Sequence, residues 1–429
     1  MKLRRVHLAE LSRAERAALV RRRAVPDPEI RAAAARICDD VASNGDEAIR
    51  RLAAEHGGGF RRVPAEELTE ALGTLDADIR EALERAAAHI ERVHQAQLPT
   101  DTEVVTVPGV TVRRRWRPLR RIGAYVPGGK ASYPSTVLMT TVPARVAGVN
   151  EVVVATPEGP DGRIPEVVLA ACALVGVDEV WAIGGAQAIA ALAYGTETVR
   201  PVDKIVGPGS PWVTAAKLAV FGVCGIDLPA GPSEALVLAD GSADPRLVAV
   251  DLLCQAEHGP DSPAVLVTTD PELADRVEGE IARLLPDLER RDILAAALED
   301  HGMVVIVDDR ESGLAFADDY AAEHVSIHTE DPERDAKAVS AAGSVYVGRW
   351  APESAGDYAT GANHVLPTGG LAHAYGPLSV ADFGSWRQEQ HLTRDGLAEL
   401  RPVVETLATA EGFGAHRLAV EARFDQEVR

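Results

Sequence analysis

The sequence predicts an α/β protein with two doubly wound, Rossmann-like domains and mainly parallel sheets. Short runs rich in Val and Ile alternate with helix-length, alanine-rich segments from about residue 120 to residue 350. This alternation is typical of parallel sheets whose two faces are both covered by helices. The candidate strands divide at the turn-forming stretch 229–232 (PAGP), so we expect two sheets rather than one.

Helices and then a hairpin are expected before the first of these sheets. Residues 28–98 have helical patterns: Asp27 and Pro28 are typical of a helix start, and residues 44–46 (NGD) of one helix ending and the next beginning. From residue 102 valines flank Pro108-Gly109, which indicates a short hairpin.

The sequence also predicts the strands of the two sheets, the structure of the C-terminal segment and the domain boundaries. The expected strands are residues 122–125, 151–155, 179–183, 204–206, 235–238, 264–268, 303–307, 325–328 and 344–347. Residues 380–429 are strongly charged and are expected to be helical. The predicted domains are residues 1–24 as an N-terminal extension, 25–121 with 233–378 as the larger α/β domain, 122–232 as the second Rossmann-like domain, and 379–429 as a C-terminal helical arm.

Bulk properties limit the classes of function. A chain of 429 residues needs more than one core, and 46% hydrophobic with 25% charged residues is ordinary for a globular protein. A net charge of −21 argues against nucleic-acid binding. The basic run at residues 113–121 is read either as a solvated strand and loop or as an anion site. No membrane span is found, no signal peptide is expected, and four scattered cysteines favour the cytoplasm.

Two glycine turns follow candidate strands, although the sequence G-x-G-x-x-G of dinucleotide-binding folds does not occur after any of them. Residues 184–187 (GGAQ) open a helix, and residues 207–209 (GPG) have the same placement. Backbone amides at such helix starts can bind an anionic group. Plain tight turns are the alternative.

Eight of the twelve histidines lie at or after residue 258, which places the chemistry in the second half of the chain. In residues 252–260 (LLCQAEHGP) both Gln255 and Cys254 could share a helix face with His258, and spacing alone does not choose between them. Glu323 and His324 precede a strand, where both could reach one crevice for acid–base work.

Two glycine-containing segments combine carboxylate and imidazole groups. Residues 354–367 (SAGDYATGANHVLP) hold Asp357 and His364, and a carboxylate with an imidazole is a ligand set suited to zinc. Glu411 and His416 repeat the pairing on the predicted arm, which could cap its own site or reach into that of a neighbour.

Six motifs in this order resemble the histidinol dehydrogenase family from about residue 25 to the chain end. They are residues 123–129 (GAYVPGG), 184–190 (GGAQAIA), 229–234 (PAGPSE), 255–260 (QAEHGP), the pair Glu323-His324, and 354–367. The resemblance implies a cytoplasmic homodimer that oxidises L-histidinol to L-histidine in two NAD-linked steps through a bound aldehyde, with zinc holding the substrate.

The resemblance also implies a role for individual residues. Zinc ligands would be Gln255, His258, Asp357 and His416, all of which would also contact substrate. Ser233, His324, His364 and Glu411 would be further substrate contacts. His324 would accept the alcohol proton, and Glu323 would activate the water that attacks the aldehyde. Tyr125, Gln187 and Ser210 would lie along the cofactor, and the arm would carry Glu411 and His416 into the partner's site.

Two departures from the family pattern leave the substrate open. Ser210 stands where the family usually has Asn, and residues 384–390 (GSWRQEQ) replace a basic residue and a Thr-Val-Gln run. A related zinc- and NAD-dependent enzyme acting on another small alcohol, such as a sulfonated diol, is therefore the first alternative. A zinc hydrolase is the second, because zinc beside a Glu-His pair can activate water. A non-catalytic metal-binding protein would leave Glu323-His324 without a purpose.

Overall fold

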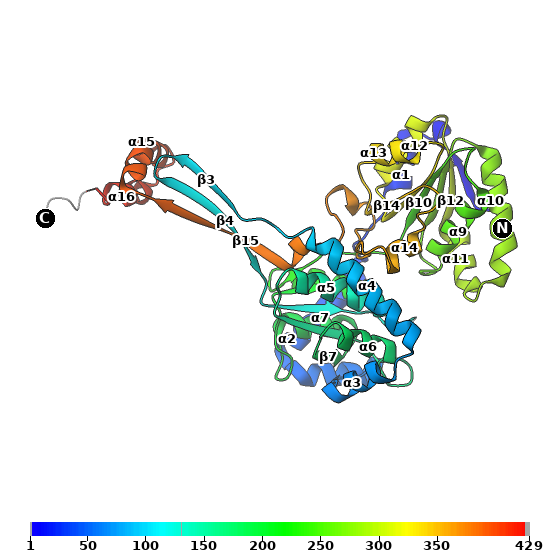
Figure 1. Ribbon diagram of the computed structural model, residues 1–429, viewed down its shortest axis with the longest axis horizontal. Helices are drawn as coiled ribbons and strands as arrows, with labels where there is room; N and C mark the ends of the chain where they lie inside the picture. Colours follow the sequence, from blue (N-terminus) through cyan, green and yellow to red (C-terminus); the bar gives the residue numbers. More distant parts are fainter. Residues whose placement is uncertain (1, 130, 425–429) are drawn as a thin grey trace. The chain divides into compact units, whose positions relative to one another are not determined.

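The computed structural model describes residues 2–129 and 131–424 (Figure 1). The chain divides into two compact units. The first unit comprises the residues up to Gln97 together with Leu119–Phe383. The second unit comprises Leu98–Pro118 and the residues from Gly384 onward.

One six-stranded parallel sheet of the first unit has the strand order β1-β12-β11-β10-β13-β14. Its strands are β1 (Arg4–His7), β10 (Ala235–Ala239), β11 (Ala264–Thr268), β12 (Gly302–Ile306), β13 (His324–His328) and β14 (Ser344–Val347). Helices α9 (Pro245–Ala256), α10 (Pro271–Leu284) and α11 (Arg291–His301) cover one face, and α1 (Arg13–Val20), α12 (Arg310–Tyr320) and α13 (Pro332–Ala338) cover the other (Figure 1). Val237 and Leu236, which are adjacent on β10, contribute to opposite cores, as the two-residue period of a strand requires.

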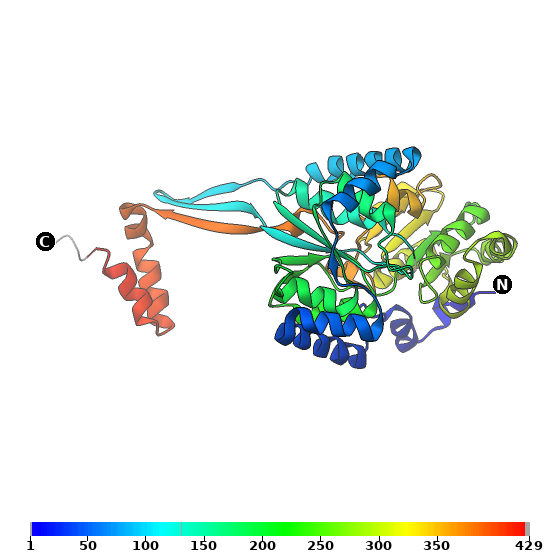
Figure 2. The same ribbon diagram turned by 90° about the horizontal axis from the view of Figure 1, so that it is seen from below.

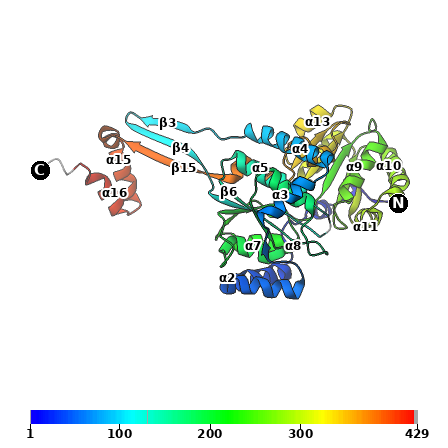
Figure 3. The same ribbon diagram turned by 60° about the horizontal axis from the view of Figure 1, so that its bottom comes forward.

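The other six-stranded sheet has the order β2-β7-β6-β5-β8-β9 and is parallel except for β2. Its strands are β2 (Arg61–Arg62), β5 (Arg121–Tyr125), β6 (Glu151–Thr156), β7 (Glu179–Ala182), β8 (Lys204–Val206) and β9 (Gly225–Ile226). Helices α2 (Pro28–His56), α7 (Gly185–Tyr194) and α8 (Pro211–Val220) lie on one face, and α3 (Ala65–Thr74), α4 (Ala77–Gln95), α5 (Pro134–Val146) and α6 (Glu166–Leu174) on the other (Figure 3). All nine predicted strands are therefore present, and the predicted α/β class is confirmed.

Short elements link these layers. They are η1 (Leu8–Glu10), η2 (Leu285–Asp287), α14 (Glu353–Tyr358), η3 (Leu371–His373) and η4 (Val380–Phe383). Residues 359–383 return to the second of the two sheets, where Val365 and Phe383 join the core under α5. The helix α14 precedes this return and is the element that carries Asp357.

The grouping of segments into domains differs from the prediction in several places. Residues 98–118 belong to the second unit, and Val365 and Leu378 pack in the core of the sheet that contains β5. Helix α2 packs on α7 and α8, so residues 28–97 belong with residues 122–226 and not with 233–378. Residues 1–24 are not a mere extension, because β1 is an edge strand paired with β12. The physical reason is that an amphipathic helix does not specify which sheet it covers, and a short charged edge strand (RRVH) lacks a strand pattern.

The second unit is a three-stranded antiparallel sheet in the order β15-β4-β3, followed by two helices (Figure 2). The strands are β3 (Thr102–Val107), β4 (Val110–Pro118) and β15 (Gly384–Leu392), and the helices are α15 (Arg394–Ala410) and α16 (Gly414–Glu421). The predicted hairpin is present, with Gly109 at φ 82° in its turn. The purely helical arm was wrong for residues 384–392, because β15 is polar and mostly exposed and so lacks apolar alternation.

The basic run is explained by contacts within the chain. Arg113 lies 2.6 Å from Glu103, and Arg115 lies 3.1 Å from Asp101. The guanidinium of Arg114 stacks 3.8 Å from the Trp386 ring centre. These contacts favour the interpretation as a paired strand surface over that of an anion site.

Within the part of the chain that the structure describes, no helix combines the length and the apolar composition that crossing a membrane requires.

Candidate active site

A cleft of about 430 Å³ lies between the two large sheets of the first unit. From one sheet it is lined by the loop after β5 and by the turn after β8, which contribute Gly128, Gly209 and Ser210. Strand β5 has β6 on one side and β8 on the other, so these loops leave the sheet at the point where the strand order reverses. Ligands of doubly wound sheets bind at this point.

The other sheet and the segment that follows it line the same cleft with chemically active side chains. They are Ser233, His258, Glu323, His324, Asp357 and His364. Ser233 precedes β10, and Glu323 and His324 stand at the start of β13, next to β10 in the sheet. The predicted pair at a strand start therefore does reach one crevice, and it does so at the amino ends of its strands.

Glycine is required in the turn after β8. Gly207 has φ 111°, and a Cβ there would lie 2.2 Å from the Tyr125 carbonyl oxygen. A Cβ on Gly209 would lie 2.4 Å from Val213. The backbone can therefore turn closely against β5 only without side chains, which leaves the amides of the turn beside the cleft.

The three residues expected along the cofactor have different surroundings. Ser210 is exposed and lines the cleft. The Tyr125 side chain is buried, and its hydroxyl accepts a hydrogen bond from the Gly185 amide at 3.1 Å. Gln187 stands in the first turn of α7 beside Gly185. Among the described residues, Tyr125 and Gln187 thus support the turn after β7 and do not line the cleft itself.

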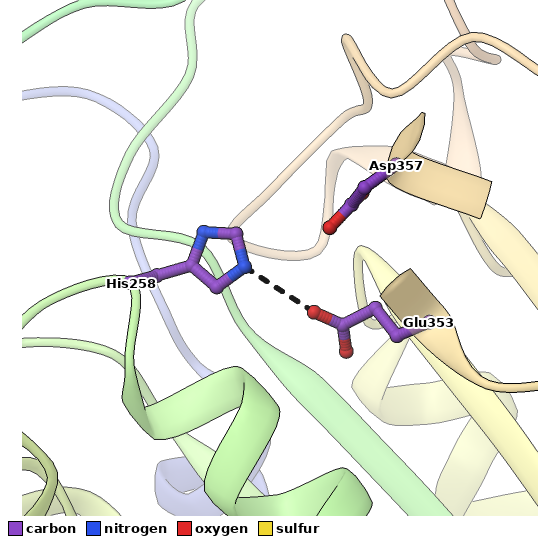
Figure 4. A group of neighbouring side chains, drawn as sticks. All are labelled: His258, Glu353 and Asp357. Atoms are coloured by element: carbon purple, nitrogen blue, oxygen red, sulfur yellow. Dashed lines mark ion pairs between the residues drawn. The ribbon is translucent and has the colours of Figure 1, made fainter. Parts of the chain in front are cut away.

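Three side chains converge as a candidate metal centre (Figure 4). One potential ligand atom from each of His258, Glu353 and Asp357 lies within 4.8 Å of the others. Glu353 and Asp357 are four residues apart on α14 and therefore share a helix face. Their carboxylates face the imidazole of His258, whose Nε2 is 3.3 Å from Glu353 Oε1.

Gln255 is a further polar group in this region, and it is buried. It lies on α9 three residues before His258, and its side chain is fully buried. Neither amide atom of Gln255 has a hydrogen-bond partner in the described chain. A buried, unsatisfied amide costs free energy unless something binds it, so its oxygen suits a bound metal ion. Cys254, the softer donor, is half-buried, and burial raises the pKa of its thiol and disfavours the thiolate that would bind zinc.

Charges at this centre act strongly on one another. Burial lowers the pKa of His258, but the facing Glu353 carboxylate, with Asp357 and Glu323, outweighs burial and raises it to about 9. Burial raises the pKa of Glu353, but the imidazoles of His324 and His258 outweigh it and lower that pKa. The carboxylates of this centre therefore favour positive charge beside them, as expected of a cation site.

The Glu323-His324 pair is buried in the cleft wall. Glu323 Oε2 accepts hydrogen bonds from Ser233 Oγ at 2.6 Å and from the Glu234 amide at 3.0 Å. Burial is the main cause that raises the pKa of Glu323. Burial also lowers the pKa of His324, but Glu353 and Glu323 outweigh it and raise that pKa. A carboxyl and an imidazole with perturbed pKa values in one cleft are typical of acid–base chemistry.

His364 is held at the cleft by its own loop. Its Nδ1 is 3.1 Å from the Asp357 carbonyl oxygen, and since a carbonyl only accepts, Nδ1 carries the proton. Burial lowers the pKa of His364, which favours the neutral ring. The neighbouring Asn363 donates to the Met139 carbonyl at 2.8 Å and lies 3.4 Å from His94 Nε2. These contacts fix the loop to α4 and α5.

Glu411 and His416 belong to the second unit. Glu411 directly follows α15 as its C-cap residue, and His416 lies on α16 with its ring 5.1 Å from that of Phe413. Both side chains are exposed. Their contribution to the site of the first unit stays a prediction.

Glu353 is the residue of this centre that the sequence did not indicate. It lies just outside the motif at residues 354–367, and nothing in composition distinguishes it from many exposed glutamates. Its spacing of four from Asp357 was the available signal. The structure shows it to be 1% exposed.

Comparison with known proteins identifies the family. The sequence profile of histidinol dehydrogenase matches residues 20–424. Histidinol dehydrogenase of Halobacterium salinarum is 47% identical over 427 residues, covering 98% of this chain and 99% of the relative. That of Vibrio parahaemolyticus is 42% identical and covers 99% of each chain.

A solved structure gives the same result. The crystal structure of histidinol dehydrogenase from Elizabethkingia anophelis has a TM-score of 0.92 and 35% identity, and the match covers 99% of this chain and 98% of that one. An acetylating aldehyde dehydrogenase from Geobacillus thermoglucosidasius, at TM-score 0.50 and 13% identity, shares the fold alone. From its motifs, its cleft and this full-length similarity, the chain belongs to the histidinol dehydrogenase family.

Proposed function

We propose that this protein is a zinc- and NAD-dependent histidinol dehydrogenase that oxidises L-histidinol to L-histidine through an aldehyde. The observation that carries the proposal is the cleft itself. The cleft is lined by the Glu323-His324 pair and, from the other sheet, by glycine turns at the point where the strand order reverses. The chain also aligns with histidinol dehydrogenases over nearly its whole length.

Zinc fits the donor set at the base of this cleft. Gln255, His258 and Asp357 would hold it, and the unpartnered buried amide of Gln255 supports that assignment. His416 from the arm of a second copy would be the fourth ligand. Two imidazoles, a carboxylate and an amide oxygen form a borderline-hard set that suits zinc. When bound, zinc would hold the imidazole and amino nitrogens of the substrate.

NAD fits the side of the cleft that is formed by the loops of the sheet containing β5 and β8. The turn after β8 and the loop after β5 present glycine backbone at the switch point, with Ser210 at the start of α8. Ser210 would contact the cofactor directly. Tyr125 and Gln187 would act there by shaping the turn after β7.

The reaction divides between the two residues at the start of β13. His324 would accept the hydroxyl proton of the bound alcohol as hydride leaves its carbon for the cofactor. Glu323 would accept a proton from the water that adds to the aldehyde carbon. The hydrate would then give its hydride to a second NAD and lose its hydroxyl proton, which leaves the carboxylate. A pKa raised by burial makes Glu323 a stronger base than an exposed carboxylate. Ser233, His364 and Glu411 would complete the substrate contacts.

The working form would be a cytoplasmic homodimer with shared active sites. The support is the division of the proposed ligands between the two units of the chain, with Glu411 and His416 on the second. An oxidation of another small alcohol, such as a sulfonated diol, fits the same cleft. Named relatives at 42–47% identity favour histidinol instead. A zinc hydrolase would leave the glycine turns without a use.

Turnover with histidinol tests the proposal. Zinc-loaded protein with L-histidinol and NAD should form two NADH per histidine produced, followed at the absorbance of NADH. A chelator should abolish turnover, and added zinc should restore it. Turnover with another alcohol only would contradict the proposed substrate, and hydrolysis without NAD would contradict the dehydrogenase.

A further inference from the structure

Glu353 lies between the imidazoles of His258 and His324. Its Oε1 faces His258 Nε2 at 3.3 Å, and its Oε2 faces His324 Nδ1 at 3.8 Å. The carboxylate is 1% exposed, and Oε1 has no hydrogen-bond donor in the described chain. A buried carboxylate is unfavourable unless neighbouring groups compensate its charge. Among the described residues, His258 and His324 are the cationic partners that face it within 4.0 Å.

Glu323 is the other carboxylate near His324, and it is already occupied. Its Oε2 is also 3.8 Å from His324 Nδ1, but this oxygen accepts hydrogen bonds from Ser233 and from the Glu234 amide. Both donor residues directly precede β10, so these hydrogen bonds hold the Glu323 carboxylate at the start of that strand. The carboxylate that remains available to the His324 ring is therefore Glu353.

The His324 ring itself needs a partner. It is 2% exposed, and neither ring nitrogen has a hydrogen-bond partner in the described chain. A neutral imidazole carries its proton on one nitrogen only, and a carboxylate accepts but does not donate. A carboxylate at Nδ1 therefore keeps the proton there and leaves the lone pair on Nε2, as the aspartate does in a Ser-His-Asp triad.

We propose that Glu353 is a positioning residue that orients His324 and holds it as the Nδ1–H tautomer, so that Nε2 can accept the substrate's proton. This inference rests on the proposed function, which assigns that proton transfer to His324. The present separation exceeds a hydrogen bond by about 1 Å, and such contacts commonly tighten when substrate binds. Because α14 carries both Glu353 and Asp357, one helix would align the metal centre and the base.

The test is Glu353→Gln, with Glu333→Gln as its matched control. Glu333 also follows a proline in the first turn of a short helix, but it is exposed. Glu353→Gln should lower kcat roughly 10- to 100-fold, the usual cost of losing a partner that orients an active histidine, with KM and zinc content close to wild type. Glu333→Gln should change none of the three.

A spectroscopic measurement separates orientation from other roles. In zinc-loaded, ¹⁵N-histidine-labelled protein, the His324 ring signals are those that vanish in His324→Gln. They should report the Nδ1–H tautomer in the wild type and a shift toward the Nε2–H tautomer in Glu353→Gln. The tautomer of His324 is measured without turnover. A wrong assignment of the substrate can therefore be distinguished from a wrong assignment of the role of Glu353.

Two results would overturn the inference. Loss of zinc in Glu353→Gln would make Glu353 a metal ligand, and an unchanged tautomer with unchanged kcat would give it no role in orienting the base. If Glu353→Gln does not fold, Glu353→Asp replaces it, because this change keeps the charge but withdraws it by roughly one bond length, about 1.5 Å. It should then show the same tautomer shift and an intermediate loss of kcat.

Discussion

Two hydrogen bonds determine how Glu323 is presented to the cleft. One comes from the Glu234 amide, and the other comes from the Ser233 hydroxyl, whose oxygen is 2.6 Å from Glu323 Oε2. The resemblance to the family assigned Ser233 to the substrate, whereas the structure connects it to the proposed base. A hydrogen bond to a buried charged group contributes about 1.5–3 kcal/mol. Ser233 therefore acts on the chemistry through Glu323, whatever else it contacts.

We expect Ser233→Ala to slow the hydration step more than the alcohol step. The loss of the hydroxyl leaves Glu323 held only by the backbone amide, so turnover starting from the aldehyde should fall about tenfold, equivalent to about 1.4 kcal/mol. The measurement compares NADH formation from histidinal with the first NADH formed from histidinol in a single turnover, which precedes hydration. Ser242→Ala is the control, because Ser242 also donates to a carboxylate, that of Asp240, but at the far end of β10. Equal loss from both substrates would contradict the separate role of Glu323.

The turn after β8 is held by a buried ion pair. Lys217 on α8 pairs with Asp227 and also donates to the carbonyl oxygens of Gly207 and Leu228 at 3.0 and 3.2 Å. Asp227 accepts in turn from the Gly207 amide at 2.7 Å. The side chains of Lys217 and Asp227 are 3% and 1% exposed. The turn that would bind the cofactor is therefore held in place by the buried ion pair between Lys217 and Asp227.

Removal of one partner of this pair should affect stability and cofactor binding together. Lys217→Met leaves the Asp227 carboxylate buried and unpaired, which should lower the free energy of unfolding by about 3–5 kcal/mol. It should also weaken NAD binding, because the Gly207 turn loses its anchor. Urea unfolding and calorimetric NAD titration measure the two effects.

The double variant Lys217→Met/Asp227→Asn provides the check on this mechanism. It should lose less stability than the sum of the two single variants, because no uncompensated charge remains. Strict additivity would mean that the pair does not interact as the structure indicates.

At the scale of the whole molecule, the proposed site residues are divided between the two units of the chain. Gln255, His258, Glu323 and His324 belong to the first unit, and Glu411 and His416 to the second. The exposed apolar side chains of the second unit include Val403, Leu407 and Leu418, as expected of a surface that a partner covers. A shared active site would explain both features.

Mixing two inactive variants tests that sharing. His324→Ala and His416→Ala should each be inactive alone. Co-expressed at equal levels, they should give about a quarter of wild-type activity, because half of the dimers are mixed and each mixed dimer has one intact site out of two. The heterodimer is then purified through two different tags, and its NADH formation should be about half that of the wild type. No recovery in a purified heterodimer would contradict sites completed by the partner's arm.

The sequence by itself determined the α/β class, the nine sheet strands and the Glu323-His324 pair. Each of these depends on local patterns: apolar runs of strand length, turn residues, and polar groups where packing does not explain them. It did not predict β1 or β15, because charged, exposed strands lack that pattern.

Only the tertiary structure decided which elements share a core and which side chains meet. Helix α2 covers a sheet formed by residues far along the chain, and no local pattern names that sheet. Glu353 differs from an exposed glutamate such as Glu333 only in its burial between His258 and His324. The burial of Glu353 and its closeness to the two imidazoles result from packing between distant parts of the chain. The charges and pKa values at this metal centre therefore depend on the fold and are not specified by the local sequence motif.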